Sequence, residues 1–195
     1  SSEDYQSIVN STVSDIDGNI YHTIQIGDQL WMRSNLRTSR FNNGASLKKS
    51  TVYNSLSTPR EEGMTIIDSI NNNYGTLYNY YAVIEEGLCP SGWHIPSVDE
   101  WITMISHLGG ECNLGELSNT NNGIDLCSEM GGMVNPENII DPISGYGETG
   151  YWWTSSNIGR NTAAYYQLSK SDSCIQKSGA KEGNFLSIRC VKNSQ

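Results

Sequence analysis

The order of the secondary-structure patterns constrains the fold of this 195-residue chain more than any other feature of its sequence. Short runs of alternating apolar and polar residues come first, and helical patterns occupy the middle of the chain. Four more short β-type runs follow, at residues 150–155, 163–168, 173–176 and 185–191. A strand–helix–strand order without an internal repeat predicts an α+β fold with a mostly antiparallel sheet.

The N-terminal part of the chain has the pattern of a β-meander. Residues 1–11 are polar and lack periodicity, so we expect a tether there and a single domain over residues 12–195. The dipeptide Asp17-Gly18 is a strong hairpin signal, because a type I′ turn needs positive φ angles. Residues 20–26 then alternate apolar and polar, and a second turn leads into residues 29–32. We therefore expect a three-stranded meander.

Two later segments have helical patterns. Residues 77–84 carry apolar side chains at i, i+3, i+4 and i+7, which predicts an amphipathic helix. Ser97 and Glu100 have the spacing of a capping box, in which each side chain accepts a hydrogen bond from a free backbone N–H. Apolar residues follow on one face, and Gly109-Gly110 supplies the end. A second helix is therefore predicted over residues 97–108.

Two other regions have the composition of loops. Residues 42–63 are rich in Asn, Ser, Lys and Glu and are expected to be a surface excursion. Residues 110–150 hold many Asn, Gly and Pro, and only the apolar stretch 124–133 predicts an embedded helical turn. Loops of this length inside a compact domain are usually functional or disordered. The region 110–150 is therefore a candidate recognition surface.

Charge and hydropathy exclude several kinds of partner. The chain has 12 basic and 21 acidic residues and a formal charge of −9, and its basic residues do not cluster. This balance argues against nucleic-acid binding, which needs a basic surface for the phosphate backbone. No run of 18 apolar residues occurs, so no membrane-spanning segment is expected.

The sequence lacks the common catalytic and metal-binding motifs. Its three His have no ligand spacing, and HExxH, GxSxG and P-loop patterns are absent. Residues 15–19 resemble the start of a calcium loop, but Ile20 and Ile26 stand where an EF-hand needs Gly and Glu. Neighbouring acids such as Glu61-Glu62 cannot face each other across a cleft as glycosidase carboxylates do. We therefore expect no metal ligands and no catalytic residues.

Five cysteines without a CxxC pattern indicate at least one disulfide and an oxidising compartment; five reduced, buried cysteines are the alternative. A bond between Cys89 and Cys190 would close a loop of about 100 residues, which the chain-entropy model values at roughly 4–5 kcal/mol. Cys112 and Cys127 flank an Asn-rich loop and could form a smaller staple, which would leave Cys174 over. A nucleophilic Cys174 would need a nearby cation or base, and the sequence shows none.

Several blocks resemble one known family. They are DIDGNIY at 15–21, IQIGDQLWM at 24–32 with Asn35-Leu36, YGTLYNYYAV at 74–83, LCPSGWHIP at 88–96 with Glu100-Trp101, GYWWTSS at 150–156 and SIRCVK at 187–192. In their order and over nearly the whole chain, these blocks are similar to the Fibrobacter succinogenes major paralogous domain of secreted and surface lipoproteins.

The resemblance implies a C-type-lectin-like fold, with two helices, a small twisted sheet and the two termini brought together. In that fold a cysteine near the first helix pairs with one on the final strand, which corresponds to Cys89 and Cys190. The implied activity is binding rather than turnover, on a face that we expect at residues 113–149 and 157–184. The implied location is extracellular or on the outer-membrane surface, with a lipid anchor upstream of Ser1.

The sequence departs from sugar-binding C-type lectins at their calcium ligands. Asn135-Pro136-Glu137 is the reverse of the Glu-Pro-Asn triplet and lies before the Trp-Trp strand, and Trp-Asn-Asp is absent. We therefore expect no cofactor, with calcium as the alternative. Sulfatase-modifying oxidases share the fold but use a copper-binding cysteine pair, which has no evident match here.

The leading hypothesis is a non-catalytic module that binds a glycan or a protein through its long-loop face. Exposed Asn, Ser and Tyr side chains suit adaptable hydrogen bonding with rigid aromatic contact. The candidate contacts are Asn135, Glu137, Tyr146, Trp153, Asn157, Arg160, Tyr165 and Lys177. The alternatives are an enzyme, either a cysteine oxidase or a glycan hydrolase using loop acids, and a surface spacer without a ligand.

Overall fold

The computed structural model describes residues 11–49, 65–68, 74–112, 124 and 126–193. Three sequence predictions fall wholly or partly outside these residues. They are the tether, of which only residue 11 is described, residues 50–63 of the predicted excursion, and residues 113–123 of the long loop region.

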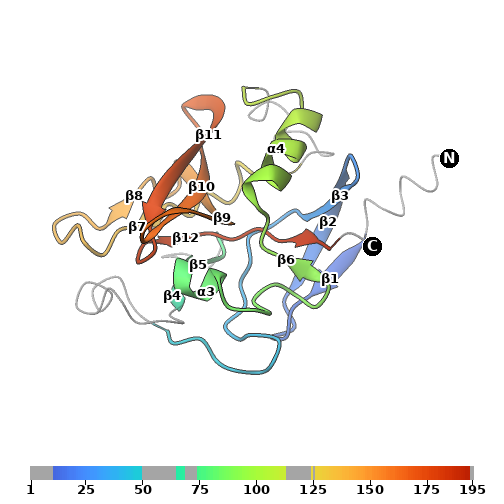
Figure 1. Cartoon of the computed structure of the whole chain (residues 1–195), viewed down its shortest axis with the longest axis horizontal. Helices are drawn as coiled ribbons and strands as arrows, with labels where there is room; N and C mark the ends of the chain where they lie inside the picture. Colours follow the sequence, from blue (N-terminus) through green and yellow to red (C-terminus); the bar gives the residue numbers. More distant parts are fainter. Residues whose placement is uncertain (1–10, 50–64, 69–73, 113–123, 125, 194–195) are drawn as a thin grey trace.

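Within the described residues, the chain forms three small sheets with antiparallel ladders and two short helices (Figure 1). The first sheet has the order β1-β2-β3-β13-β6, the second β11-β10-β9, and the third β4-β5-β12-β7-β8. This architecture confirms the α+β prediction, whereas the expectation of one sheet is wrong. Neither helix is long and apolar enough to cross a membrane.

The bounds of these elements are as follows. The strands are β1 Thr12–Ser14, β2 Ile20–Ile26, β3 Gln29–Met32, β4 Thr65–Asp68, β5 Thr76–Asn79, β6 Trp93–His94, β7 Met133–Val134, β8 Ile143–Ser144, β9 Thr149–Gly159, β10 Thr162–Ser169, β11 Asp172–Lys181, β12 Phe185–Leu186 and β13 Val191–Lys192. The helices are α3 Tyr80–Val83 and α4 Val98–His107.

The meander and the capped helix form as predicted. Val13 pairs with Tyr21 and Ile24 with Trp31, so β1, β2 and β3 are consecutive antiparallel strands. The Ser97 hydroxyl accepts from the Glu100 backbone N–H, and the Glu100 carboxylate accepts from the Ser97 N–H. Both halves of the capping box are thus present at the start of α4.

The predicted helix over residues 77–84 is wrong in its first half. Residues 76–79 form strand β5, which lies between β4 and β12, and α3 begins only at Tyr80. The Asn79 side chain caps this short helix by accepting from the Ala82 N–H. Leu77 and Tyr78 are both buried although they point to opposite faces of β5. Because both faces of this strand are buried, its apolar residues do not alternate with polar ones, and their spacing resembled that of a helix.

The predicted helical turn at 124–133 is also absent from the described residues 124 and 126–133. Gly132 has φ = 70°, a left-handed conformation that interrupts a helix. A Cβ atom at Gly132 would lie 2.7 Å from the Ser144 carbonyl oxygen, so this backbone packs directly on β8. The chain at Gly132 therefore packs in an irregular conformation against the backbone of β8 instead of forming a helical turn.

The four C-terminal β runs are all present, but the last one is divided. Residues 185–191 form β12 and the start of β13, which belong to different sheets. Between them, Ser187 forms two backbone hydrogen bonds with β9. Its carbonyl accepts from the Trp153 N–H, and its N–H donates to the Tyr151 carbonyl, each at 3.0 Å. Figure 1 shows this segment crossing the middle of the molecule. One buried segment therefore joins all three sheets.

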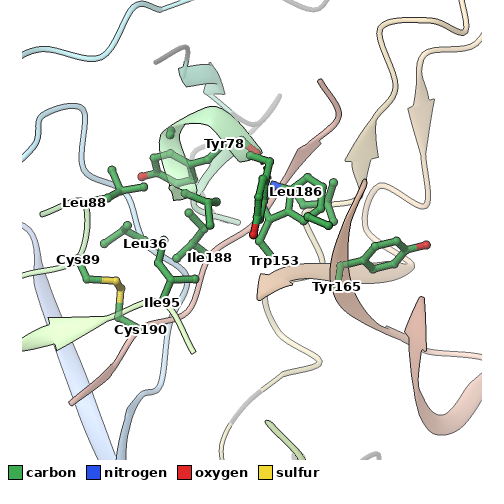
Figure 2. Packing of buried hydrophobic residues seen from close by; sticks show 14 of the residues in the cluster. Leu36, Tyr78, Leu88, Cys89, Ile95, Trp153, Tyr165, Leu186, Ile188 and Cys190 are labelled. Carbon is green, nitrogen blue, oxygen red and sulfur yellow. Dashed lines mark hydrogen bonds between the residues drawn. A yellow bond between two sulfur atoms is a disulfide. The ribbon is translucent and has the colours of Figure 1, made fainter. Parts of the chain in front are cut away.

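Two disulfides are present among the described cysteines. Cys89 and Cys190 are bonded, with their Cα atoms 6.1 Å apart, which confirms the pairing that the family resemblance implied. Figure 2 shows Leu36, Ile95 and Ile188 between this bond and Trp153. The proposed Cys112–Cys127 staple is wrong, because Cys112 is bonded to Cys174 of β11. Cys174 lies 62 residues from Cys112 in the sequence, so the prediction failed because it paired Cys112 with the next cysteine along the chain.

A polar cluster around Arg189 is buried between the sheets. Arg189 is 0% exposed, and its guanidinium donates to Asn35 Oδ1 at 3.1 Å and lies 3.5 Å from Glu129 Oε2. Trp152 Nε1 donates to the same Asn35 oxygen at 2.8 Å. A buried charge is tolerated only when it is paired and hydrogen-bonded, so these partners fix the path of the C-terminal segment.

Removing the Cys89–Cys190 disulfide tests how strongly the fold depends on it. We expect the double variant Cys89→Ala/Cys190→Ala to lose about 3–5 kcal/mol in free energy of unfolding, because the bond closes a long loop and both cysteines are buried. Urea unfolding measures the loss. The control, Cys127→Ala, should change the stability by less than about 1.5 kcal/mol, since this half-buried residue is in neither bond. Equal losses in both variants would contradict this assignment.

A second stabilising interaction lies at the first turn, where the Asp17 carboxylate accepts from the Ser39 N–H at 2.6 Å and from Arg40 Nε at 2.5 Å. Burial raises the pKa of Asp17, but the hydrogen bonds from Ser39 and Arg40 outweigh this effect and lower it to about 2. The ionised carboxylate therefore stabilises the fold above the ordinary pKa of 3.8.

We expect Asp17→Asn to lose about 1–2 kcal/mol of stability at pH 7, after allowance for partial solvent screening. Because the folded pKa is depressed, the wild-type advantage should be complete above about pH 4 and should vanish as pH falls towards 2. Urea unfolding of both proteins at pH 7, 4 and 2.5 measures it. A difference that stays constant over this range would contradict the role of Asp17.

Candidate binding site

A cavity of about 220 Å³ lies where three loops meet beside α3. The loops are the β7–β8 connection, the β9–β10 turn and the β11–β12 turn. The residues that line the cavity are Tyr81, Pro136, Glu137, Arg160, Asn161, Thr162, Lys181, Glu182, Gly183 and Asn184. Most of these side chains are polar or charged, so the cavity suits a hydrophilic ligand.

The β7–β8 connection is held rigid by its own hydrogen bonds. Asn135 N–H donates to the Pro142 carbonyl at 2.7 Å and closes the loop. The Asn135 side chain accepts from Glu137 N–H at 3.0 Å, and the Asn138 side chain accepts from Asp141 N–H at 3.2 Å. Such side-chain turns fix short loops. The Glu137 carboxylate is therefore presented from a defined backbone.

The β9–β10 turn forms the opposite wall. Asn161 has φ = 58°, a left-handed conformation that Asn tolerates better than most residues. Its carbonyl accepts from Glu182 N–H at 3.2 Å, which ties this turn to the β11–β12 turn. Arg160, beside Asn161, thus projects from a turn that is anchored at its base.

Two acidic and two basic residues line the cavity. Lys181 Nζ and Glu137 Oε2 form an ion pair at 2.5 Å that joins β11 to the β7–β8 connection. Asn157 Nδ2 donates to Glu182 Oε1 at 3.2 Å. Within the described part of the chain, the Arg160 guanidinium has no protein partner. Glu137 is therefore ion-paired, Glu182 accepts one hydrogen bond from a neutral amide, and Arg160 is a cation without a partner among the described residues.

Asn184 is the most unusual residue of the cavity wall. It is 7% exposed, and its Oδ1 atom has no hydrogen-bond partner among the described residues. Its Nδ2 atom contacts only the weak acceptor Sδ of Met133, at 3.7 Å. A buried amide oxygen without a partner costs about 1–3 kcal/mol. The cavity therefore holds a hydrogen-bonding group that the fold leaves unsatisfied.

The structure brings together three of the predicted contact residues. Glu137 and Arg160 line the cavity, and Asn157 reaches its edge through Glu182. Asn135 does not line the cavity but shapes the loop that carries Glu137.

The other predicted contacts do not meet at this site. Trp153 is fully buried, and its Nε1 donates to the Tyr78 carbonyl, so its prediction as a ligand contact is wrong. Tyr165 is only 7% exposed and packs against Trp153, so it also belongs to the core. Tyr146 packs on Tyr74, and Lys177 is exposed on β11 away from the cavity. Bulky aromatic residues in strands are more often core than contact residues, which explains the errors at Trp153 and Tyr165. Tyr146 and Lys177 stay predictions as contacts elsewhere on the surface.

Sequence reasoning missed several cavity residues. Lys181, Glu182 and Asn184 fall inside or beside the expected face at 157–184, but no individual signal distinguished them. Tyr81 lies outside that face, in the segment that was predicted to be an amphipathic helix. Only the turn between β11 and β12, a Glu-Gly-Asn sequence, carried a local hint of an exposed polar loop.

A second hollow lies between residues 83–89 and residues 93–95, beside the disulfide cysteine Cys89. The ring nitrogens of its His94 are both in hydrogen bonds, to Glu100 Oε1 and to Asn193 Oδ1, each at 2.6 Å. The imidazole of this hollow is therefore already satisfied, whereas the first cavity has a buried amide oxygen without a partner among the described residues, which makes it the stronger candidate.

Metal ligands do not gather in the described part of the chain. No group of three or more His, Cys, Asp or Glu side chains there is placed to hold a metal ion.

Comparison with known proteins gives one match. The family model described as Fibrobacter succinogenes major domain matches residues 24–192. No curated protein and no solved structure matches the chain.

Replacing Asn184 by Leu tests whether its amide is a stabilising or an unsatisfied group. We expect Asn184→Leu to leave the free energy of unfolding within about 1 kcal/mol of wild type, because an unpaired polar group is exchanged for an apolar one of similar size. Chemical unfolding measures the change. A loss above about 2 kcal/mol would show that the amide makes strong bonds in the fold.

Proposed function

The chain belongs to the Fibrobacter succinogenes major domain family, and we propose that it is a secreted or surface-anchored module that binds a glycan without turnover. The proposed binding site is the cavity between the β7–β8, β9–β10 and β11–β12 loops. The fold that we propose for it is C-type-lectin-like.

The buried amide of Asn184 is the observation that carries this proposal. A sugar hydroxyl can both donate and accept a hydrogen bond, so it can satisfy either end of that amide. The same cavity offers a guanidinium, an ammonium, two carboxylates and the Thr162 hydroxyl. A dense set of donors and acceptors on rigid loops suits a polyhydroxylated ligand.

Tyr81 supports the same ligand class. Its side chain is half-buried and lines the cavity from helix α3. A tyrosine offers an apolar ring and a polar hydroxyl together, with little conformational entropy to lose on binding. It can therefore pack against the C–H face of a sugar ring while other groups bond to the hydroxyls.

Two features support the proposed fold and location. Cys89 lies before the capped helix and is bonded to Cys190 near the final strand, the arrangement that the C-type-lectin-like resemblance implies. Disulfides persist mainly in oxidising compartments, so two such bonds favour a location outside the cytoplasm.

Catalysis by a free cysteine is the less favoured hypothesis. Cys174, the residue considered as a nucleophile, is bonded to Cys112. A thiolate is the reactive form of cysteine, so this disulfide would first have to open.

Protein recognition is a second candidate function, favoured by the tip of the β7–β8 connection. Ile139 and Ile140 are 75% and 97% exposed on a loop that its own hydrogen bonds hold rigid. Adjacent exposed isoleucines on an ordered loop can enter an apolar pocket of a partner at low entropic cost. They lie three residues or fewer beyond Glu137, so such a partner would cover the cavity rim.

A glycan array followed by calorimetry tests the leading proposal. We expect one class of oligosaccharide to bind wild-type protein, and Asn184→Leu to weaken that binding at least tenfold because the amide no longer bonds to the ligand. The matched control is Asn193→Leu in the second hollow, which should bind within twofold of wild type. Addition of EDTA should not change the affinity.

Three outcomes would contradict parts of the proposal. An array without binding would reject glycan recognition and favour a protein partner. Equal losses in the two leucine variants would place the site elsewhere. Consumption of the bound oligosaccharide would show that the protein is an enzyme.

A further inference from the structure

We infer that the cavity selects an acidic saccharide, a chain of hexuronate residues, whose carboxylate binds Arg160 while a neighbouring hydroxyl binds Asn184. This inference rests on the proposed glycan-binding function and adds the chemical class of the sugar. It follows from which groups of the cavity are already engaged and which are available.

The acidic groups of the cavity are engaged within the protein. Glu137 is paired with Lys181 at 2.5 Å, and Glu182 accepts from Asn157 at 3.2 Å. A cationic ligand would have to compete with these partners for a carboxylate. A positively charged ligand would therefore find only the remaining acceptor sites of Glu182.

The available charge is Arg160. Its guanidinium lacks a hydrogen-bond or ion-pair partner within the described residues, although it lines the same cavity. A guanidinium presents its N–H groups as a planar fork that matches a carboxylate with two parallel hydrogen bonds. A carboxylate on the ligand can therefore bind Arg160 without displacing any protein contact.

The backbone around Arg160 is prepared for this role. The Arg160 carbonyl accepts from the Thr162 hydroxyl at 3.4 Å, and the Asn161 carbonyl accepts from Glu182 N–H at 3.2 Å. The turn is thus fixed on both sides of the arginine, and only the side chain needs to be ordered on binding. Ordering one side chain costs less than ordering a loop.

The second group is the Asn184 amide, which belongs to a residue of the same cavity wall and reaches a ligand when the side chain turns towards the cavity. Its Oδ1 atom is buried in the cavity wall and lacks a partner among the described residues. A ligand that satisfies both groups needs an anionic oxygen pair and a hydroxyl in one compact unit. A hexuronate residue carries both on a single ring.

The net charge of the whole chain further limits the class of acidic ligand that the cavity can bind. A formal charge of −9 repels densely charged polyanions such as nucleic acids or multiply sulfated chains. A hexuronate chain carries one charge per sugar, and the cavity itself is neutral, with two acids and two bases among its lining residues. One carboxylate in the cavity is therefore compatible with the acidic surface around it.

Matched pairs of oligosaccharides test this inference. Oligomers of galacturonate, glucuronate and mannuronate are each titrated as the free acid and as the neutral methyl ester, at 0.15 M salt. The ester keeps every hydroxyl and removes only the charge. We expect at least one free acid to bind tenfold or more tightly than its ester.

Two variants locate the preference. Arg160→Gln should reduce the preference for the free acid over the ester to less than twofold. Lys170→Gln removes an equal charge from the β10–β11 turn, at the other end of β10 from Arg160, and should keep the wild-type preference. Circular dichroism confirms that each variant is folded.

The outcomes separate this inference from the proposed function. Equal affinity for acid and ester, unchanged in Arg160→Gln, would overturn the inference and leave glycan binding intact. An acid preference that survives Arg160→Gln would assign the carboxylate to another cation and would also overturn it. Absence of binding to any oligosaccharide, on this panel and on the array, would overturn the proposed function itself.

Discussion

The structure depends on the burial of one C-terminal segment, residues 185–191, between three sheets. β12 pairs with β5 and β7 in one sheet, Ser187 bonds to β9 in another, and β13 pairs with β3 and β6 in the third. The shared segment therefore joins the three sheets into one folded unit. The Cys89 disulfide and the Arg189 cluster hold this segment at the point where it passes between sheets.

The candidate site lies where this central segment begins. Asn184 immediately precedes β12, and the β7–β8 connection that carries Glu137 leaves the strand beside β12. The paired strands β9, β10 and β11 bring Arg160 and Lys181 to the same cavity. Rigid strands thus position short polar loops, an arrangement common in binding modules. The same segment that unites the fold therefore also places the buried amide in the cavity wall.

Local signals in the sequence predicted local structure well. The capping box of Ser97 and the turn at Asp17-Gly18 are short-range interactions, and both form as expected. Features that depend on tertiary packing were predicted poorly: the strand at 76–79 resembled a helix because both of its faces are buried, and Cys174 could not be identified as the partner of Cys112. Arg160 and Trp153 were both predicted to contact a ligand, but Arg160 lines the cavity whereas Trp153 is buried. The residue types alone do not show which side chain is exposed. The family resemblance supplied the Cys89–Cys190 pairing and a proposed face that contains most of the residues lining the cavity, but it did not indicate the cavity.

The central claim is that a sugar binds in the cavity walled by Arg160 and Asn184. Nuclear magnetic resonance of uniformly ¹⁵N-labelled protein during titration with the oligosaccharide that binds most tightly tests it most directly. The account predicts that the backbone amides of residues 137, 160–162 and 181–184 shift together, along with the side-chain amide of Asn184. Shifts confined to residues 83–95, or to the exposed face of another sheet, would contradict it.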